Sequence, residues 1–159
     1  MNMDKKYIKR LSSNELYLLG ELFDYNDINE MMTSNSRKIE NGEIDIFGLF
    51  LDSGIAGEIR VMYKNEDTLF AVKGKRAYLY AFRILEDFQG KGYGKYLLKQ
   101  VIGQLVMNGY SEFTVGVEDN NEVAKHIYNS LGFNELIARK QEEYQGDKYE
   151  YSLYLKVEK

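Results

Sequence analysis

A glycine-rich hexapeptide, Gln89-Gly90-Lys91-Gly92-Tyr93-Gly94, places the strongest constraint on how this chain folds. It follows the most apolar strand-like run, Ala77 to Leu85, and leads directly into a long amphipathic segment. Glycines at alternate positions leave the turning backbone without Cβ atoms, so successive N–H groups can converge on a phosphate at a helix N-terminus. Such a hexapeptide taken alone is more often a flexible surface turn. The flanking strand and helix favour an anion site here, with a pyrophosphate or a similar group as the ligand.

Two well-known phosphate loops do not fit this spacing. A Walker loop ends in Gly-Lys-Ser/Thr, whereas Gly94 is followed by Lys95-Tyr96, and a dinucleotide fingerprint needs two residues where only Tyr93 stands. The pattern Gln-Gly-x-Gly-x-Gly after a strand instead resembles the acyl-CoA pyrophosphate loop of the GNAT N-acetyltransferase superfamily. A second block, residues 121–133, resembles the Asn-x-x-Ala-x-x-x-Tyr-x-x-x-Gly-Phe helix of the same family position by position.

The resemblance covers residues 77–133, the part of the family that binds the cofactor, and it implies both a fold and a site. The implied fold is α/β (α+β), a mixed, mostly antiparallel sheet of about seven strands with a splayed parallel pair and about four flanking helices. Residues 1–159 are expected to form a single N-acetyltransferase domain, with helices in about residues 12–41 lining the acceptor site. Backbone groups at Phe82 and Ile84 are expected to bind the pantetheine arm. The full set of expected acetyl-CoA-binding residues is Phe82, Arg83, Ile84, Gln89, Gly90, Lys91, Gly92, Tyr93, Gly94, Asn121 and Tyr128.

Composition narrows the class of protein further. A length of 159 residues, with 44% hydrophobic and 29% charged residues, is typical of one globular domain. The absence of cysteine excludes disulfides, thiolate metal sites and an acyl-cysteine intermediate, and with a single histidine we expect no metal. The net charge of −4 argues against a nucleic-acid partner. No apolar run follows the basic N-terminal residues and none is long enough to span a bilayer, so we expect a cytoplasmic protein with neither a signal peptide nor a membrane partner.

Apolar periodicity and turn residues predict the remaining elements. Ser12-Ser13-Asn14-Glu15 has the form of a capping box and predicts a helix start, and Asn108-Gly109 predicts the end of the helix that follows the glycines. His126 is expected to face solvent. The expected strands are residues 7–11, 44–51, 55–63, 77–85, 113–117, 135–145 and 148–157, with a further helix at about 27–40.

The expected mechanism is direct attack of an acceptor amine on the acetyl thioester in one ternary complex, because the chain has no cysteine and no Gly-x-Ser-x-Gly nucleophile elbow. Tyr128 is expected to protonate the departing thiolate, although its apolar helix face also suits a core aromatic. Several family members carry a carboxylate on the central strand where this chain has Tyr78 and Tyr80, which are not bases at neutral pH. The general base is left open between Glu118, Glu58 and a chain of water molecules.

The expected function is therefore transfer of the acetyl group of acetyl-CoA, used as co-substrate, to a primary amine of a small-molecule or peptide acceptor. A second hypothesis is a catalytically weak member of the family that binds acyl-CoA as a sensor or regulatory module. The candidates for meeting the amine are Asp24, Tyr25, Asp27 and Glu30, although an acidic helix start also suits the helix dipole. The identity of the acceptor, whether the acyl group is strictly acetyl, and whether the chain forms a homodimer are left open.

Overall fold

The computed structural model describes residues 5–158, and its strands form one seven-stranded sheet in the order β1-β2-β3-β4-β5-β7-β6. Neighbouring strands are antiparallel except for β4 and β5, which are parallel. The strands are β1 Tyr7–Arg10, β2 Ile44–Leu51, β3 Gly54–Met62, β4 Arg76–Ile84, β5 Glu112–Glu118, β6 Glu135–Tyr144 and β7 Asp147–Val157. Residues 1–4, on which part of the expectation of no signal peptide rests, lie outside the described residues.

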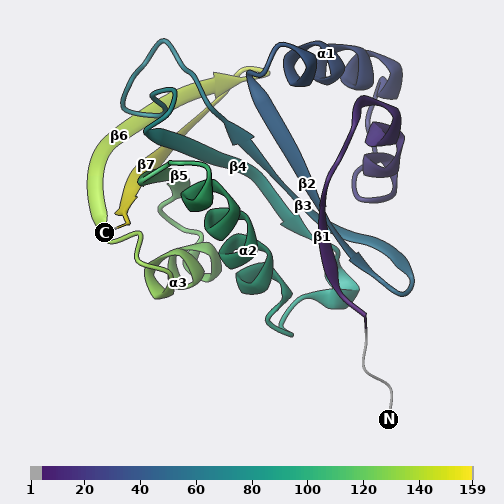
Figure 1. The fold of residues 1–159 in the computed structure, drawn as a ribbon. Coiled ribbons are helices and arrows are strands. Elements are labelled where there is room, and N and C mark those ends of the chain that lie inside the picture. Colours follow the sequence, from purple (N-terminus) through teal and green to yellow (C-terminus); the bar gives the residue numbers. More distant parts are fainter. Residues whose placement is uncertain (1–4, 159) are drawn as a thin grey trace.

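The helices lie on both faces of this sheet (Figure 1). They are η1 Ser13–Glu21, α1 Ile28–Glu40, η2 Glu86–Phe88, α2 Tyr93–Met107 and α3 Glu122–Ser130. The two longer helices of the second half, α2 and α3, cover one face, while η1 and α1 pack over β2 and β3 on the other. Within residues 5–158, no helix is long and apolar enough to cross a membrane.

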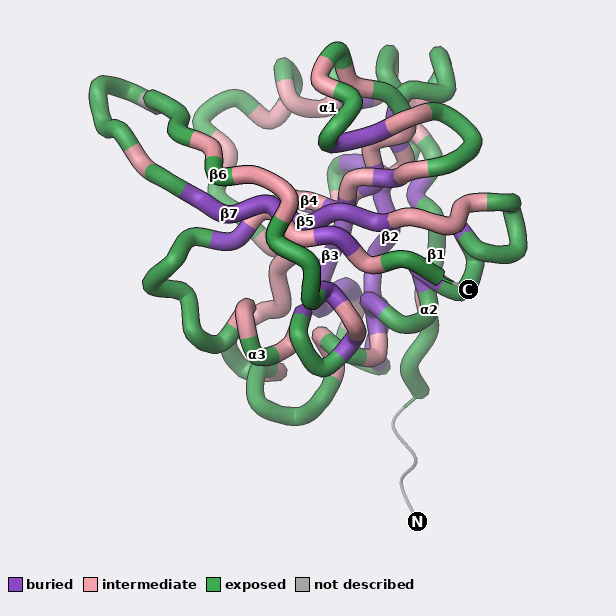
Figure 2. The backbone as a smooth tube through the Cα atoms, turned by 90° about the vertical axis from the view of Figure 1, so that its left-hand side faces the viewer, coloured by how far each residue is buried: buried purple, intermediate pink, exposed green. Residues whose placement is uncertain are grey.

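The sheet buries apolar side chains on both faces because alternate residues of a strand point to opposite sides. On β2, Phe47 and Leu49 belong to the core that α2 and α3 complete, whereas Ile44 and Ile46 belong to the core beneath η1 and α1. Figure 2 shows that the buried positions follow the central strands, while the outer ends of β6 and β7 project from the body and are exposed. The cores therefore hold the central strands on both sides and leave the tip of the β6–β7 hairpin to solvent.

Helix α2, which follows the glycine loop, packs on the sheet through one apolar stripe. Its buried residues recur on one stripe, and each apolar side chain of this size contributes roughly 1.5–3 kcal/mol when fully buried. The stripe consists of Leu97, Leu98, Val101, Ile102 and Leu105. The stripe fixes α2 against the sheet, and with it the glycine loop at the helix N-terminus.

The first helical segment, η1, has the predicted start but a tighter winding than an α-helix. Glu15 accepts hydrogen bonds from the backbone N–H and the hydroxyl of Ser12, both at 3.0 Å, which is the predicted capping interaction. The backbone hydrogen bonds of η1 are those of a 3₁₀ helix over all nine residues, whereas 3₁₀ helices are usually shorter. Leu16 and Leu19 are fully buried with a spacing of three, which matches the three residues per turn of this helix.

A β-bulge in β4 reverses the direction in which its later side chains point. Tyr80 pairs with Arg60 of β3, but the next pair joins Arg83 to Glu58, so β4 contains one extra residue at this point. Ala81 adopts the left-handed conformation, with φ of 52°. One inserted residue exchanges the two faces of a strand beyond it. The bulge was not foreseen from the sequence, which predicts an uninterrupted strand here.

The loop between β3 and β4 is tied to the sheet rather than loose. The buried hydroxyl of Thr114 on β5 donates a 2.6 Å hydrogen bond to the carbonyl of Phe70, and Arg76 donates to the carbonyl of Leu69. Lys140 of β6 forms an ion pair with Asp67. These contacts hold the loop over the face of β5 that α2 and α3 do not cover, where it helps to form a pocket.

Candidate acetyl-transfer site

The parallel strands β4 and β5 separate part-way along their length. They pair from Arg76 with Glu112 to Leu79 with Val115, and no pairing between them continues beyond this point, although β4 runs on to Ile84 and β5 to Glu118. The backbone N–H of Leu85 donates a hydrogen bond to the carbonyl of Ala56 on β3. Because successive residues of a strand direct their backbone N–H and C=O groups to opposite edges, those of Phe82 and Ile84 point away from β3, toward the gap. Backbone groups that face such a gap need hydrogen-bond partners. An extended, amide-bearing ligand could supply them.

The glycine loop lies at the end of β4, and its glycines have different roles. Gly90 and Gly92 have φ of 76° and 85°, and a Cβ at either position would meet nothing within 4 Å. Gly92 is the N-cap of α2, so the first N–H groups of this helix have no partner within it. Gly94 serves packing instead, because a Cβ there would lie 2.9 Å from Cζ of Phe82. The positive φ and the open space at Gly90 and Gly92 are compatible with the predicted anion cradle, which stays a prediction.

Gln89 is in contact with the strand that precedes it. Its side-chain amide donates a 2.8 Å hydrogen bond to the carbonyl of Ile84. This bond ties the start of the glycine loop to the end of β4, and it engages one of the two backbone positions predicted to bind pantetheine. Lys91 and Lys95 are exposed beside the loop, with Nζ of Lys91 5.9 Å from the ring of Phe88.

Tyr128 lies in the core cluster with its ring between two phenylalanines. The ring centroids of Phe82 and Phe133 are 6.2 and 5.7 Å away, and the side chain is 8% exposed. Among the described residues its hydroxyl has no hydrogen-bond partner. Burial raises the pKa of this phenol above its usual value, so it keeps its proton at any neutral pH. The core role and the predicted acid role are therefore compatible, because the first uses the ring and the second uses the hydroxyl.

Asn121 has a structural role at the start of α3. Its side-chain oxygen accepts a 3.1 Å hydrogen bond from the backbone N–H of Ala124, as an N-cap residue does. This contact orients the helix that carries Tyr128. His126 on the same helix is exposed, as predicted. The cap leaves the amide nitrogen of Asn121 facing away from the helix bond, so a cofactor contact stays a prediction.

Glu58 is fully buried between two arginines on the face opposite α2 and α3. Its Oε2 accepts a 3.1 Å hydrogen bond from Nε of Arg60, and its Oε1 lies 2.9 Å from Nε of Arg83 in an ion pair without hydrogen-bond geometry. Arg60 also donates to Tyr25 and Asn35. Both oxygens of Glu58 are thus engaged by guanidinium groups, and the carboxylate is poorly placed to accept a proton from an acceptor.

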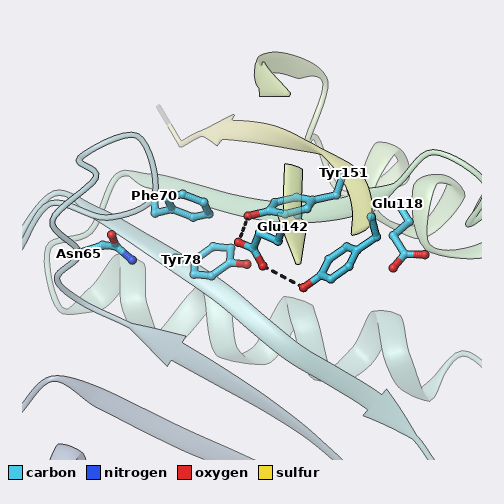
Figure 3. Close-up of a pocket in the computed structure, with 8 residues that line it drawn as sticks. Asn65, Phe70, Tyr78, Glu118, Glu142 and Tyr151 are labelled. Atoms are coloured by element: carbon cyan, nitrogen blue, oxygen red, sulfur yellow. Dashed lines mark hydrogen bonds between the residues drawn. The ribbon is translucent and has the colours of Figure 1, made fainter. Parts of the chain in front are cut away.

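A pocket of about 400 Å³ opens beside the point where β4 and β5 separate (Figure 3). It lies on the face of Glu58 and not on the face of Tyr128. In Figure 3, Tyr78 and Glu142 point toward one another across it. Its lining residues are Asn65, Phe70, Tyr78, Gly116, Glu118, Glu142, Tyr149 and Tyr151. Glu118, one of the candidate bases, therefore faces this pocket, while Glu58 does not line it.

The carboxylate of Glu142 is held in the pocket by two tyrosines. Tyr151 donates a 2.6 Å hydrogen bond to Oε1, and Tyr149 donates a 2.8 Å hydrogen bond to Oε2. Burial, followed by its own hydrogen bond to Glu142, raises the pKa of Tyr151, and burial together with the nearby Glu142 raises the pKa of Tyr78 to about 12. Tyr78 and Tyr151 are therefore neutral hydrogen-bond donors at physiological pH.

The acidic residues predicted near the start of α1 do not line this pocket. Asp27 is the N-cap of α1, and its Oδ1 accepts a 3.0 Å hydrogen bond from the N–H of Glu30. This is the helix-start interpretation of the acidic residues, which the sequence also allowed. On the hairpin side, the pocket is lined by β6 and β7.

Comparison with known families decides the assignment. Residues 14–133, more than half of the chain, match the model of the acetyltransferase (GNAT) family. The chain belongs to the GNAT acetyltransferase family. The acyltransferase class and the family predicted from the two motifs are thus confirmed, and acetyl-CoA is the acetyl donor of this family.

Relatives of this GNAT protein include ribosomal protein bS18-alanine N-acetyltransferases. The one from Haemophilus ducreyi is 31% identical over 98 residues, which cover 58% of this chain and 68% of the relative. The one from Escherichia coli K12 is 34% identical over 64 residues, which cover 40% of this chain but only 43% of the relative. The sequence similarity covers only part of this chain. It therefore does not show that this chain acts on the acceptors of these relatives.

Solved structures confirm the predicted fold over nearly the whole length. The Escherichia coli ribosomal-protein-S18-alanine N-acetyltransferase is similar with a TM-score of 0.75 at 19% identity, covering 96% of this chain and 94% of that one. A ribosomal L7/L12 alpha-N-protein acetyltransferase in complex with coenzyme A has a TM-score of 0.76 at 16% identity, with the same coverages. At these identities the likeness shows the fold alone.

Sequence reasoning missed most of the pocket of this GNAT protein. The sequence motifs single out Glu118 and Tyr78 but not Tyr149, Tyr151 or Glu142. A signal was available, because Glu142 and Tyr149 are directly paired across the hairpin. Extending the register from the turn at Gly146 would have placed this carboxylate opposite a tyrosine on the same face.

Proposed function

We propose that this GNAT protein transfers the acetyl group of acetyl-CoA directly to a primary amine within a ternary complex. The observation that carries the proposal is the separation of β4 and β5, which leaves backbone groups of Phe82 and Ile84 between the glycine loop and the pocket. Two substrates could approach this gap from opposite faces of the sheet. The absence of cysteine supports direct transfer, because no thiol can carry the acetyl group in between.

The residues on the α2 side fit the co-substrate. The N–H groups at Gly90 to Gly94 would bind the pyrophosphate, as helix N-termini bind anions, and Lys91 and Lys95 would add positive charge nearby. Phe82 and Ile84 would pair with the amides of the pantetheine arm in the manner of an added strand. Acetyl-CoA supplies the acetyl thioester. A backbone N–H facing the gap would stabilise the negative charge that develops on the thioester oxygen.

The remaining steps move protons off nitrogen and onto sulfur. The acceptor ammonium first loses one proton to Glu118, directly or through water, and Glu118 passes it to solvent, because only the neutral amine can attack. The amine nitrogen then forms a bond to the acetyl carbon, the bond from carbon to sulfur breaks, and the nitrogen loses its second proton to the freed Glu118 or to water. Glu118 is preferred over Glu58 because it faces the pocket with no guanidinium on its carboxylate. Tyr128 donates a proton to the leaving sulfur and regains one from solvent.

The acceptor is proposed to occupy the pocket between β5, the hairpin and the 64–75 loop. Its carboxylates and tyrosine hydroxyls suit an amine, which arrives as an ammonium group. Relatives named for the acetylation of alanine in a ribosomal protein make a peptide N-terminus one candidate, and a small amine is the other.

The test is release of coenzyme A thiol from acetyl-CoA in the presence of a panel of amines and short peptides. We expect amine-dependent thiol release together with an acetylated product identified by mass spectrometry. Tight binding of acetyl-CoA without thiol release across the panel would instead support the sensor hypothesis.

A further inference from the structure

Arg83 reaches the acceptor face of the sheet, where it is half-buried, only because of the bulge in β4. Without the extra residue its side chain would point to the same face as Leu79, toward α2. Instead, its guanidinium lies beside Glu58 and 4.6 Å from the ring centroid of Phe23, which is itself 51% exposed. The carboxylate and the ring fix the orientation of the guanidinium plane.

The two arginines beside Glu58 are engaged to different degrees. Arg60 uses Nε, Nη1 and Nη2 in hydrogen bonds to Glu58, Asn35 and Tyr25, and its side chain is 11% exposed. Arg83 uses only Nε, its side chain is 30% exposed, and among the described residues its terminal nitrogens have no hydrogen-bond partner. The single negative charge of Glu58 faces the two positive charges of Arg60 and Arg83, so the cluster has a net charge of one positive unit. We assign this excess charge to Arg83, which is the more exposed of the two arginines.

A tyrosine floor connects this charge to the pocket. The rings of Tyr78 and Tyr80 are stacked with centroids 5.5 Å apart and planes 8° from parallel. Tyr78 lines the pocket near Glu142, while Tyr80 pairs with Arg60 of β3, next to the pairing of Arg83 with Glu58. One end of the stack thus lies at the acidic pocket, and the other end lies at the cluster of Arg60, Glu58 and Arg83.

We propose that the acceptor is an amino carboxylate, whose amine reacts at the pocket while its carboxylate binds the terminal nitrogens of Arg83. The inference rests on the proposed function and names the substrate class. A planar guanidinium binds a carboxylate through two parallel hydrogen bonds, and the fork of Arg83 is already oriented for this. Tyr80 pairs with Arg60 and Arg83 pairs with Glu58, two residues of β3 apart, which is about 7 Å. The pocket residue Tyr78 lies two residues further along β4, so several methylene groups lie between amine and carboxylate.

The turnover experiment compares two acceptors that differ only in the carboxylate, 6-aminohexanoate and 6-aminohexanamide. We expect kcat/KM to be about tenfold or more higher for the acid, mainly through KM. Arg83→Gln should bring this ratio close to one, and Arg83→Lys, which keeps the charge and the pairing with Glu58 but loses the fork, should leave an intermediate ratio. The control Arg37→Gln, on the exposed side of α1, should keep the full ratio. Equal kcat/KM values in the wild type, or a preference that survives Arg83→Gln, would overturn the proposal.

A binding experiment separates failure of this inference from failure of the proposed function. 6-Acetamidohexanoate and 6-acetamidohexanamide are titrated by calorimetry into the complex with coenzyme A, where no chemistry is needed. Tighter binding of the acid in the wild type, lost in Arg83→Gln, supports the carboxylate site even if no amine is acetylated. Equal affinity for the two compounds contradicts it even if amines are acetylated.

Discussion

Tyr128 combines two demands on one side chain. Its ring is part of the core between Phe82 and Phe133, and its hydroxyl has no hydrogen-bond partner among the described residues. Glu58 Oε1, and not this hydroxyl, is the buried side-chain oxygen without a hydrogen-bond partner among the described residues, so the Tyr128 oxygen remains accessible although its ring is buried. An accessible phenol at the edge of the core can donate to the sulfur of a bound thioester.

Tyr128→Phe separates the two roles, because it keeps the ring and removes only the proton. We expect stability and acetyl-CoA affinity to change little, while kcat falls by about 10²-fold, the lower end of the range for a lost general acid. A simple thiolate, with a pKa of about 8.5, leaves without strong acid assistance, which is why the lower end applies. Steady-state kinetics at saturating acetyl-CoA measures this, and an unchanged kcat would return Tyr128 to the core alone.

The pH profile gives an independent check on the same residue. The acid must carry its proton, and burial raises the pKa of Tyr128 above the usual phenol value. Wild-type kcat should therefore show no alkaline decline from this group below about pH 10. A decline near pH 8 or 9 that disappears in Tyr128→Phe would contradict the raised pKa.

Glu15 provides a prediction about stability. Its hydrogen bond from Lys9, followed by that from the backbone of Ser12, lowers the pKa of this carboxyl to about 2 from an ordinary value of 4.5. A folded-state pKa below the unfolded one means that the stabilisation is present above pH 4.5 and is lost as pH falls toward 2. Glu15→Gln should lower the melting temperature at pH 7, and the difference from the wild type should shrink between pH 4.5 and 2. A difference independent of pH would show that the charge is not involved.

At the scale of elements, the glycine loop and α2 are the clearest unit. Gly92→Asp would place a carboxylate and a Cβ where the N–H groups converge, in a backbone conformation unsuited to most side chains. We expect acetyl-CoA affinity to fall at least tenfold, about 1.4 kcal/mol, in a calorimetric titration. Gly42→Asp is the matched control, because Gly42 also has a positive φ, 74°, and open space around it. Equal losses in the two variants would mean that strain, and not the anion site, is responsible.

Most elements were predictable because each depends on local pattern. The strand at residues 44–51 follows from its apolar run next to the turn at 52–54, and the helix at 28–40 follows from its Asp27 cap and an irregular apolar face. The bulge at Ala81 was not predictable, since no glycine or proline marks it and the run on either side reads as one strand. The 3₁₀ winding of η1 also depends on packing of Leu16 and Leu19 that only the folded chain reveals.

The candidate site divides in the same way. The glycine loop and Tyr128 lie within continuous motifs, so the sequence was sufficient to single them out. The ion pair of Glu58 with Arg83 joins β3 to β4 across 25 residues of chain. The two hydrogen bonds to Glu142 depend on the register of the hairpin. Such contacts follow from sheet pairing, which a single sequence does not specify.

At the scale of the whole molecule, the two cores on opposite faces support a gap that neither of them fills. Binding of acetyl-CoA should therefore stabilise the folded chain, and at a free concentration 100 times Kd the gain is about 2.7 kcal/mol. Thermal unfolding with increasing acetyl-CoA should show a rising midpoint in the wild type and a smaller rise in Gly92→Asp at the same concentrations. If the unfolding midpoint did not shift at acetyl-CoA concentrations that saturate the calorimetric titration, acetyl-CoA would have to bind the unfolded chain as tightly as the folded one.

The bulge in β4 also divides the strand into two segments with opposite side-chain alternation. Before Ala81 the odd-numbered residues face α2 and α3, as Ala77 and Leu79 do, and after it the even-numbered ones do, as Phe82 does. A single-residue deletion at Ala81 would therefore act like a frameshift confined to one strand, turning the guanidinium of Arg83 toward the phenol of Tyr128 and the ring of Phe82 toward Glu58. In a scan of single-residue deletions along β4, deletion of Ala81 would disrupt the acetyl-CoA face and the acceptor face together, although this small residue is not proposed to bind either substrate.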